Sequence, residues 1–360
     1  LIRSLSLGGA ERQALINARA IKNMGYHVDI AIYRPNKLSY LDEGLNLISI
    51  NSKLGFLGQL ISLYRLAKIN QYELVYSFTG IPNVLAALLK LSLRNKIKIF
   101  WGKRATKLKL RDYSLSYRIE VFLENLLRSI PDLIIANSWA NYYELVDERW
   151  NKNKLRVIHN GIDTELFRIL NKKEDTIPFN NQDSRKIASV ARIDPMKDHV
   201  SLIKAFSKLL NHDENYELYI LGRDYKDIKK ELVCLASNLG IDKKIIFLES
   251  FSDLTNFYNN IDILISSSSY GEGFPNVIAE SMACGTPCIA TDVGDSSIII
   301  GETGIIVPPG DSDALASALI KAENISVDKE QLRKRIIRKF SLEELKKKMK
   351  GLISQELDYK

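Results

Sequence analysis

The sequence predicts an α/β protein built on doubly wound parallel sheets. Short apolar runs alternate along the whole chain with longer segments of helical periodicity, which is typical of parallel βαβ units. Glycine-containing turns follow several of these runs, where such sheets bind ligands. The chain has 360 residues, which is long enough for two domains with separate cores.

The composition is that of a globular protein, with 46% hydrophobic and 26% charged residues. No run of 18 apolar residues occurs, so we expect no transmembrane helix. Cys234, Cys284 and Cys288 are too few and too poorly spaced for a zinc site. Their odd number argues against a disulfide framework, and a reducing cytoplasm fits this cysteine content.

The positive charge is concentrated in the first part of the chain. Residues 1–160 hold 24 Lys and Arg against 12 Asp and Glu, whereas residues 161–360 have a small acidic excess. No acid occurs between Glu73 and Asp112, and a basic segment lies at 90–111. Such a segment fits an anionic membrane surface, a phosphorylated acceptor or an ordinary solvated face. Nucleic acid is the least favoured partner, because no binding motif accompanies the charge.

The first domain is expected to alternate strands and helices from its start. Residues 1–3 resemble the tail of a strand whose beginning is missing. A helix follows and ends at Gly25. The apolar patterns predict further strands at 28–33, 47–50, 74–77, 97–101 and 133–136, and helices at 57–68, 84–93 and 115–128.

Two places in this domain are candidate ligand contacts. Gly8 and Gly9 allow positive φ and close approach of the backbone to a ligand, although a plain tight turn is the alternative. Arg104 follows a predicted strand end, where it could clamp the phosphate or carboxylate of an acceptor, or be one more surface cation.

The second domain follows a polar linker at 168–185. A strand at 186–190 leads to Arg192 and, five residues later, to Lys197 near a helix start. Two cations at the carboxyl end of a strand suit the two phosphates of a diphosphate, although exposed surface cations are the alternative. The pattern predicts further strands at 218–221, 245–248, 261–265, 287–291 and 304–307, and a last helix at 341–357 that opens with a capping box.

The stretch 266–280, SSSSYGEGFPNVIAE, is the most informative one in the chain. It predicts a strand end, a glycine loop and a helix that begins near Pro275. Such a helix end offers backbone N–H groups and a positive dipole to an anion. Glu272 and Glu280 would repel a phosphate, so we expect them to accept hydrogen bonds from sugar and ribose hydroxyls. The alternative is a common βα turn with surface glutamates.

These motifs resemble one family of enzymes. EGFPNVIAE followed by SMACGTP is similar to the E-x7-E region of the retaining glycosyltransferases of family GT4, which have the GT-B fold. Arg192 and Lys197 resemble the diphosphate-binding pair of that family, LGGAER at 7–12 its N-terminal glycine loop, and NGID at 160–163 its domain junction. Phe78 stands where the family usually has a histidine, which puts any role of that histidine in doubt here.

The resemblance implies two Rossmann-like domains facing across a cleft: an acceptor domain at 1–165, a nucleotide-sugar domain at 166–340, and a helix at 341–360 that crosses back. It implies transfer of a sugar from a nucleotide diphosphate sugar to an acceptor hydroxyl, with retained configuration and no metal or other cofactor. The catalytic residues would be Arg192, Lys197 and Glu272. The same three residues would bind the donor together with Gly9, Gly273, Phe274, Pro275, Asn276, Val277 and Glu280. Gly8 and Arg104 would bind the acceptor.

We expect such an enzyme in the cytoplasm, with peripheral attachment to the inner face of the membrane as an option. The acceptor is expected to be a saccharide or a lipid-linked one, in the assembly of bacterial surface polysaccharide or glycolipid. Two alternatives stay open. One is a non-catalytic protein that binds nucleotide sugars within an assembly complex, for which Phe78 is the motive. The other is a nucleotide-sugar epimerase of the same fold.

Overall fold

The protein divides into two compact units in its computed structural model. Unit 1 comprises Leu1–Gly161 and Leu342–Lys360, and unit 2 comprises Ile162–Ser341. The sequence placed the two boundaries at 165/166 and 340/341. The structure describes residues 1–360 except 6–7, 35–43, 51–52, 105, 107–113, 172–178, 180, 182, 226, 323–327 and 358–360.

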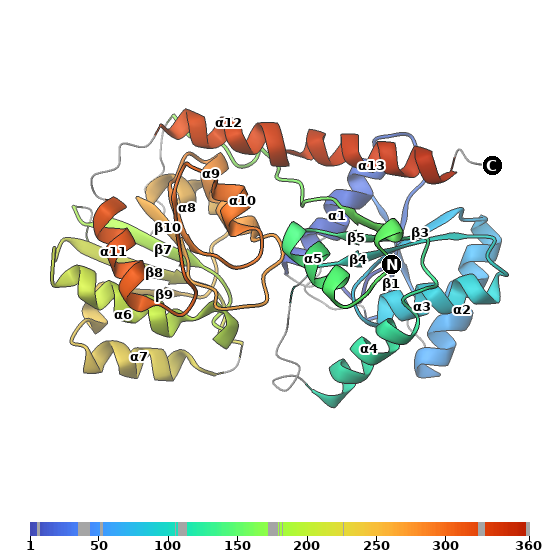
Figure 1. Cartoon of the computed structure of the whole chain (residues 1–360), viewed down its shortest axis with the longest axis horizontal. Helices are drawn as coiled ribbons and strands as arrows, with labels where there is room; N and C mark the ends of the chain where they lie inside the picture. The colour runs from blue at the N-terminus through green and yellow to red at the C-terminus, as the bar shows by residue number, and fades with distance from the viewer. Residues whose placement is uncertain are drawn as a thin grey trace. The chain divides into compact units, whose positions relative to one another are not determined.

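Unit 1 alternates strands and helices in chain order, as Figure 1 shows. Its strands are β1 (Asp29–Ile32), β2 (Asn46–Ser49), β3 (Leu74–Phe78), β4 (Lys98–Lys103), β5 (Leu133–Ala136) and β6 (Leu155–Val157). Its helices are α1 (Gly9–Lys22), α2 (Gly55–Asn70), α3 (Ile81–Ser92), α4 (Leu115–Leu126), α5 (Trp139–Asp147) and α13 (Leu342–Leu357). A short 3-10 helix, η2 (Lys152–Lys154), precedes β6.

The strands of unit 1 pair in parallel, in a four-stranded sheet of order β3-β4-β5-β6 and a two-stranded sheet β1-β2. The first residues of the chain join the two sheets. Ile2 bridges to Ile32 on one side, and the backbone N–H of Phe78 donates to Leu1 O over 3.0 Å on the other. The segment 1–3 therefore has the extended pairing that its apolar residues predict.

Helices cover both faces of these strands. Side chains of α2, α3 and α5 share one buried cluster with β4 and β5, in which Trp101 is fully buried. On the other face, Leu345, Met349, Leu352 and Ile353 of α13 pack against Phe100, Leu133, Ile135 and Ile158. The apolar stripe of the last helix thus belongs to the core of unit 1.

Unit 2 repeats the alternation. Its strands are β7 (Arg185–Val190), β8 (Tyr216–Leu221), β9 (Ile245–Leu248), β10 (Ile263–Ser266), β11 (Cys288–Thr291) and β12 (Ile305–Val307). Its helices are α6 (His199–Leu210), α7 (Lys229–Asn238), α8 (Leu254–Asn260), α9 (Asn276–Ala283), α10 (Ser296–Ile300), α11 (Ser312–Ala322) and α12 (Lys329–Phe340). Short 3-10 turns, η3 (Pro195–Lys197) and η4 (Asp242–Lys244), precede α6 and β9.

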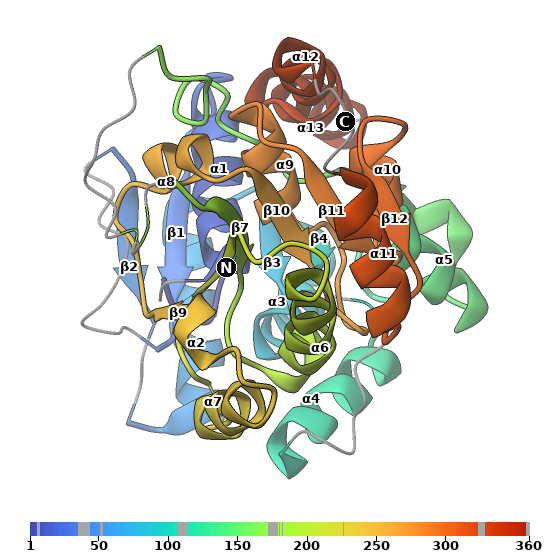
Figure 2. The same ribbon diagram turned by 90° about the vertical axis from the view of Figure 1, so that its left-hand side faces the viewer.

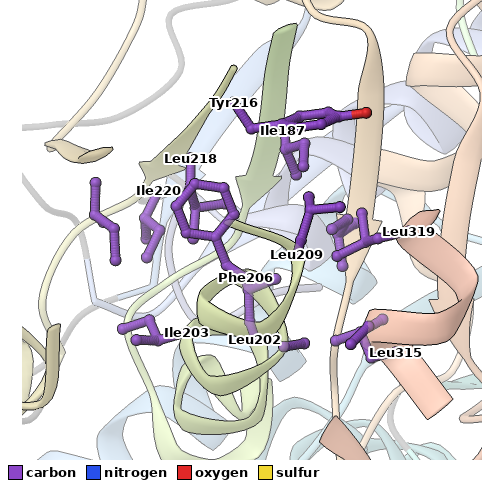
Figure 3. Packing of buried hydrophobic residues seen from close by; sticks show 14 of the residues in the cluster. Ile187, Leu202, Ile203, Phe206, Leu209, Tyr216, Leu218, Ile220, Leu315 and Leu319 are labelled. Carbon is purple, nitrogen blue, oxygen red and sulfur yellow. The ribbon is translucent and has the colours of Figure 1, made fainter. Parts of the chain in front are cut away.

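The six strands of unit 2 form one parallel sheet of order β12-β11-β10-β7-β8-β9, and Figure 2 shows it from β9 to β12 across the view. Helices α6, α7 and α11 cover one face, while α8, α9, α10 and α12 cover the other (Figure 1). Figure 3 shows the first of these cores, where Phe206 of α6 and Leu319 of α11 meet Ile187 and Leu218 of the sheet. The predicted α/β class with parallel sheets is confirmed.

Strand β6 and helix α5 of unit 1 were not predicted from the sequence. Helix α5, at Trp139–Asp147, is short, and only Asn141 and Leu145 of it are buried, so it shows little of an apolar stripe. Gly8 and Gly9 do not adopt positive φ: Gly8 is extended, with φ −150°, and Gly9 is the first residue of α1. Neither glycine uses the positive φ that its residue type allows, since the chain enters the helix here without a left-handed turn.

Candidate functional site

Three neighbouring strands of unit 2 deliver the predicted donor residues to one edge of the sheet. Strands β11, β10 and β7 are adjacent and parallel, so their carboxyl ends meet at the same edge. Arg192 and Lys197 follow β7, Glu272 follows β10, and Gly294 follows β11. The strand order therefore brings together residues that lie about a hundred positions apart in the chain.

Lys197 and Glu272 form a buried ion pair at this edge. The ammonium of Lys197 donates to Glu272 Oε1, and Ser268 Oγ donates to the same oxygen over 2.7 Å. Both side chains are largely shielded from water, with 18% and 11% of their side-chain surfaces exposed. Two donors, one from the segment after β7 and one from the segment after β10, thus share one carboxylate oxygen.

The environment of Glu272 keeps its carboxylate charged. Burial alone would raise its pKa, but the positive charge of Lys197, the hydrogen bonds from Lys197 and Ser268, and the charge of Arg192 outweigh burial. The net effect is a pKa below the ordinary range, so Glu272 is an acceptor at neutral pH. The influence of Arg192 also shows that its guanidinium lies within electrostatic reach of the pair.

Hydrogen bonds connect the loops that carry Lys197 and Glu272. Ser267 Oγ donates to Lys197 O over 2.8 Å, and the N–H of Ser269 donates to Met196 O over 2.8 Å. On the other side, Thr291 Oγ1 donates to Ser268 O over 2.6 Å. These bonds fix the backbone around the ion pair, so its geometry is set before any ligand binds.

Gly294 lets the loop after β11 approach the loop after β10. Its φ is +63°, and a Cβ at this position would lie 2.5 Å from Gly273 O and 2.8 Å from Glu272 O. The N–H of Asp295 donates to Gly273 O over 2.9 Å. Only glycine combines this backbone conformation with such close contact. Gly294 was not among the site residues predicted from the sequence.

Of Arg192, Lys197 and Glu272, Arg192 has the side chain most exposed to solvent. Its guanidinium lies 4.9 Å from the ring centre of Tyr225 and 4.0 Å from Asp194 Oδ2. Because 53% of its side chain is exposed, the fork remains accessible to an anion from solvent.

Helix α9 begins beside Glu272, as the sequence predicted, with Pro275 at its N-cap. Asn276 and Val277 occupy its first turn and are half-buried. Phe274 is buried and packs edge to face on Phe340, with 5.3 Å between ring centres. Its side chain therefore belongs to the core, and only its backbone could meet a ligand. The positive end of the helix dipole points toward the loop that holds Glu272.

Glu280 lies deeper than the sequence suggested. It is 1% exposed, and Tyr258 OH of α8 donates to its Oε2 over 3.2 Å. The structure thus places the second glutamate inside the helical layer that covers the sheet, whereas Glu272 lies in the loop.

His199 is a buried polar residue that the sequence analysis did not single out. It opens α6 directly after Lys197 and Asp198, and both of its ring nitrogens are buried without a hydrogen-bond partner. Burial and the charge of Lys197 lower its pKa to about 4. The imidazole is therefore neutral at physiological pH.

The candidate acceptor residue Arg104 is held in unit 1. Its guanidinium donates to Asn160 Oδ1 and to Tyr76 OH, each over 2.8 Å. It lies 4.7 Å from the centre of the Phe78 ring. Phe78, which departs from the family pattern, is buried and supplies an aromatic face for this cation.

A cavity of about 290 Å³ also lies in unit 1, and Tyr76 and Phe78, which contact Arg104, are among the residues that line it. Its walls also include Asp29, Ile30, Leu74 and Val75, at the amino ends of β1 and β3. None of the predicted donor or acceptor residues lines it, so the cavity is not our candidate site. Among the described residues, no group of three or more His, Cys, Asp and Glu could hold a metal ion.

Two family models match the chain, one in each unit. Glycosyltransferase Family 4 matches residues 7–166, and Glycosyl transferases group 1 matches residues 171–340. The chain belongs to the group 1, GT4-type glycosyltransferases. It is an enzyme of the glycosyltransferase class, as its resemblance to the GT4 family implied.

Curated relatives are similar over most of their length. The capsular polysaccharide biosynthesis glycosyltransferase CapM of Staphylococcus aureus is 25% identical over 89% of this chain and 87% of its own. A Campylobacter jejuni enzyme named as an N-acetylgalactosaminyltransferase acting on a diphospho-undecaprenol saccharide is 27% identical, over 81% of this chain and 79% of its own.

Solved structures share the fold at lower identity. A glycosyltransferase of Rickettsia africae has a TM-score of 0.82 at 21% identity, covering 100% of this chain and 98% of its own. HepE of Anabaena, solved with UDP and glucose, has a TM-score of 0.82 at 20% identity and covers 98% of both chains. These likenesses establish the GT-B fold.

Proposed function

We propose that this chain is a retaining glycosyltransferase that moves a sugar from a nucleotide diphosphate sugar to an acceptor hydroxyl, in the assembly of surface polysaccharide or glycolipid. One observation supports this most strongly: the buried Lys197–Glu272 pair lies beside the start of α9, with Arg192 exposed nearby. Cations and a helix N-terminus stabilise a bound diphosphate, and a carboxylate accepts hydrogen bonds from sugar hydroxyls. Unit 2 offers all of these at one sheet edge.

The proposed reaction depends on stabilising the leaving group. The bond between the anomeric carbon and the phosphate oxygen breaks, the acceptor oxygen bonds to the same face of that carbon, and the acceptor proton passes to the departing phosphate. Arg192, Lys197 and the N-terminal end of α9 stabilise the negative charge that grows on the diphosphate. Lys197 can bind Glu272 and the diphosphate at the same time, because its ammonium has three donors and Glu272 uses one.

Glu272 positions the transferred sugar in this proposal. Its low pKa keeps it an acceptor for sugar hydroxyls. Gly273, Phe274 and Asn276 contribute backbone groups, while Val277 borders the start of the helix. Glu280 is the proposed ribose contact, and Tyr258 orients its carboxylate. Glu280 is 1% exposed, so a contact between its carboxylate and the ribose requires the groups that cover it on the ligand side of α9 to move aside.

Related proteins indicate which donor and acceptor to test first. HepE was solved with UDP and with UDP-glucose, so a uridine donor is the first to test. The C. jejuni relative and a galactosyltransferase of Escherichia coli are named for diphospho-undecaprenol acceptors, and a lipid-linked saccharide is the acceptor we propose here. Gly8, Gly9 and Arg104 would receive substrate in unit 1. We propose that the reaction needs no metal, since two cations and a helix end face the diphosphate.

The proposed location is the cytoplasm, with attachment to the membrane surface. Among the described residues, none of the helices has the length and apolar content that a membrane crossing requires. Two cations in the described part of the basic segment 90–111 are paired with acids of the same unit. Lys90 pairs with Asp132 over 2.6 Å, and Lys103 with Glu124 over 2.6 Å. Lys107, Lys109 and Arg111 lie outside the described residues.

The test is turnover of a panel of nucleotide sugars by the whole chain, with and without a diphospho-lipid saccharide acceptor. Lys197→Ala is expected to lower kcat by about 10²–10³-fold, the scale of losing one preorganised donor. Lys204→Ala is the matched control, because Lys204 is exposed on α6 and outside the group.

Two results would count against the proposal. Near-normal kcat of Lys197→Ala at saturating donor would remove Lys197 from the reaction. Binding of a nucleotide sugar, seen as a thermal shift, without any transfer or hydrolysis would favour a non-catalytic binding protein instead.

A further inference from the structure

The loop that follows β8 pairs with the loop that follows β7, beyond the ends of both strands. The N–H of Ile193 donates to Arg223 O over 2.9 Å, and the N–H of Tyr225 donates to Ile193 O over 3.1 Å. Ile193 and Asp224 form a parallel bridge, and the side chain of Ile193 is buried. These bonds fix the backbone on both sides of Ile193, so the loop after β8 has a set position beside Arg192.

Gly222 and Asp224 anchor this loop at its two ends. A Cβ at Gly222 would lie 1.9 Å from Ala191 O, so glycine is required for the backbone to approach this closely. The carboxylate of Asp224 accepts a hydrogen bond from the N–H of Lys229 over 3.1 Å, at the start of α7. Tyr225 lies between these anchors in the chain, and its backbone is therefore held in place.

Tyr225 presents the face of its ring to Arg192. The central carbon of the guanidinium lies over the ring, 4.9 Å from its centre, which is within the range of a cation–π contact. Tyr225 is 62% exposed, and 53% of the Arg192 side chain is exposed. An exposed arginine normally samples many rotamers, and binding an anion then costs the entropy of ordering it. The ring restricts that freedom before an anion binds.

The contact with Tyr225 leaves the hydrogen-bond donors of Arg192 available. A cation–π contact attracts the charge of the guanidinium to the ring and uses none of its N–H donors. Nη2 of Arg192 lies 3.9 Å from Met196 Sδ, a weak acceptor, and 4.0 Å from Asp194 Oδ2, which is beyond hydrogen-bond reach. Neither contact commits the guanidinium, so it is ordered by the ring and still able to bind a phosphate.

We propose that Tyr225 is a positioning residue for the donor diphosphate: its ring holds the guanidinium of Arg192 at the carboxyl end of β7, where it receives a phosphate. Tyr225 acts through Arg192 and needs no contact of its own with the substrate. The inference rests on the proposed function and deepens it, because it adds the loop after β8 to the three loops that carry the other residues of the site.

The experiment is isothermal titration of the whole chain with UDP and with inorganic pyrophosphate at low salt. Tyr225→Leu removes the ring but keeps an apolar side chain, and we expect both ligands to bind about two- to fivefold more weakly, the strength of an exposed cation–π contact. Tyr225→Phe keeps the ring face, so its affinities should equal those of the wild type. Tyr143→Leu is the matched control, because Tyr143 is similarly exposed but lies in unit 1, and it should change neither affinity.

A double-mutant cycle separates positioning of Arg192 from a general effect on the loop. In an Arg192→Gln background, the further change Tyr225→Leu should cost no affinity, because the cation that the ring holds is gone. Circular dichroism and urea midpoints establish that each variant is folded.

Equal affinities of the wild type and Tyr225→Leu would overturn the proposal. An equal loss in the Arg192→Gln background would overturn it too, since it would assign the effect to loop structure, and so would a Tyr225→Phe variant as weak as Tyr225→Leu, which would assign it to the hydroxyl. If the wild type bound neither UDP nor pyrophosphate, the diphosphate role of Arg192 would fail and the proposal with it.

The titrations contain no acceptor and measure no transfer. Diphosphate binding that depends on Tyr225, in a chain that transfers no sugar, would therefore contradict the proposed reaction and support this inference.

Discussion

The charges of Lys197 and Glu272 each offset the desolvation cost of burying the other. A single charge in this position would lose its hydration without compensation, and removing one partner of a buried pair commonly costs about 3–5 kcal/mol. Ser268 satisfies a further lone pair of the carboxylate. Any variant of either residue therefore needs a stability measurement beside its kinetics, so that loss of fold is separated from loss of chemistry.

Substitutions of Glu272 and of Glu280 should change different kinetic constants. Glu272→Gln removes charge beside the proposed sugar site, where charge and ring shape would change during reaction, and should lower kcat itself. Glu280→Gln should mainly raise the donor KM, because a ribose contact is similar in the ground and transition states. Steady-state kinetics on both variants tests this. The reverse pattern would exchange the roles, and unchanged kinetics in both would end the interpretation of this stretch as the donor site.

Tyr258→Phe is the companion to the Glu280 variant. It removes the hydroxyl that donates to Glu280 and leaves the carboxylate in place. A rise in donor KM in the same direction as in Glu280→Gln is expected if Tyr258 positions that carboxylate. A rise in neither variant would assign the pair to the core of the helical layer alone.

His199 should make stability depend on pH. In the folded protein its pKa is lowered to about 4 by burial and the charge of Lys197, with Asp198 and Asp194 acting in the opposite direction. The unfolded chain therefore binds this proton first as pH falls, and stability is lost from about pH 6.5 down to about pH 4. From pH 7 to pH 5 the loss from this residue is about 2 kcal/mol.

Urea denaturation of the wild type and of His199→Leu at both pH values isolates that contribution. The variant should lose about 2 kcal/mol less than the wild type between them, because the carboxylates that also titrate there are common to both. Equal losses would mean that the imidazole is protonated in the folded protein at pH 5.

At the scale of elements, the close approach of two loops is the feature most sensitive to substitution. Gly294→Ala would force a Cβ against the carbonyl oxygens of Gly273 and Glu272, and the loop that holds Glu272 would have to move. We expect kcat to fall by about 10²-fold or more, since small misplacements of positioning groups cost that much.

Gly240→Ala is the control for the loop prediction. Gly240 has a similar φ of +71°, but a Cβ there meets nothing within 4 Å. Both variants should lose about 1 kcal/mol of stability from the left-handed backbone, and activity should fall in Gly294→Ala alone. Full activity in both would show that the loop tolerates the shift.

At the scale of the whole molecule, the last helix belongs to the fold of the first unit. Met349 is fully buried in the cluster that α13 makes with β4 and β5. Met349→Ala should destabilise unit 1 by about 2–5 kcal/mol through lost burial and a cavity. All three tryptophans, Trp101, Trp139 and Trp150, lie in unit 1. Their fluorescence in a urea titration therefore reports this unit, and an unchanged midpoint would exclude α13 from its core.

The sequence by itself determined the class of sheet and the places of all described strands except β6. Apolar runs such as 133–136 and 245–248 match β5 and β9 residue for residue, because burial on both faces leaves a continuous local pattern. Motif spacing also indicated Arg192, Lys197 and Glu272, since each follows a strand end. These are local properties, and local pattern is what a sequence states directly.

Tertiary structure alone decided which residues meet. The partnership of Lys197 with Glu272 depends on β7 and β10 being neighbours, and strand order is set by packing of the whole sheet. The burial of Glu280 against Tyr258, the close approach at Gly294 and the contact of Glu124 in α4 with Lys103 likewise join segments far apart in the chain. Helical periodicity in a sequence shows which residues form the apolar side of a helix and which form the polar side. Only the neighbours of that helix decide which side faces water, because burial is a property of the fold.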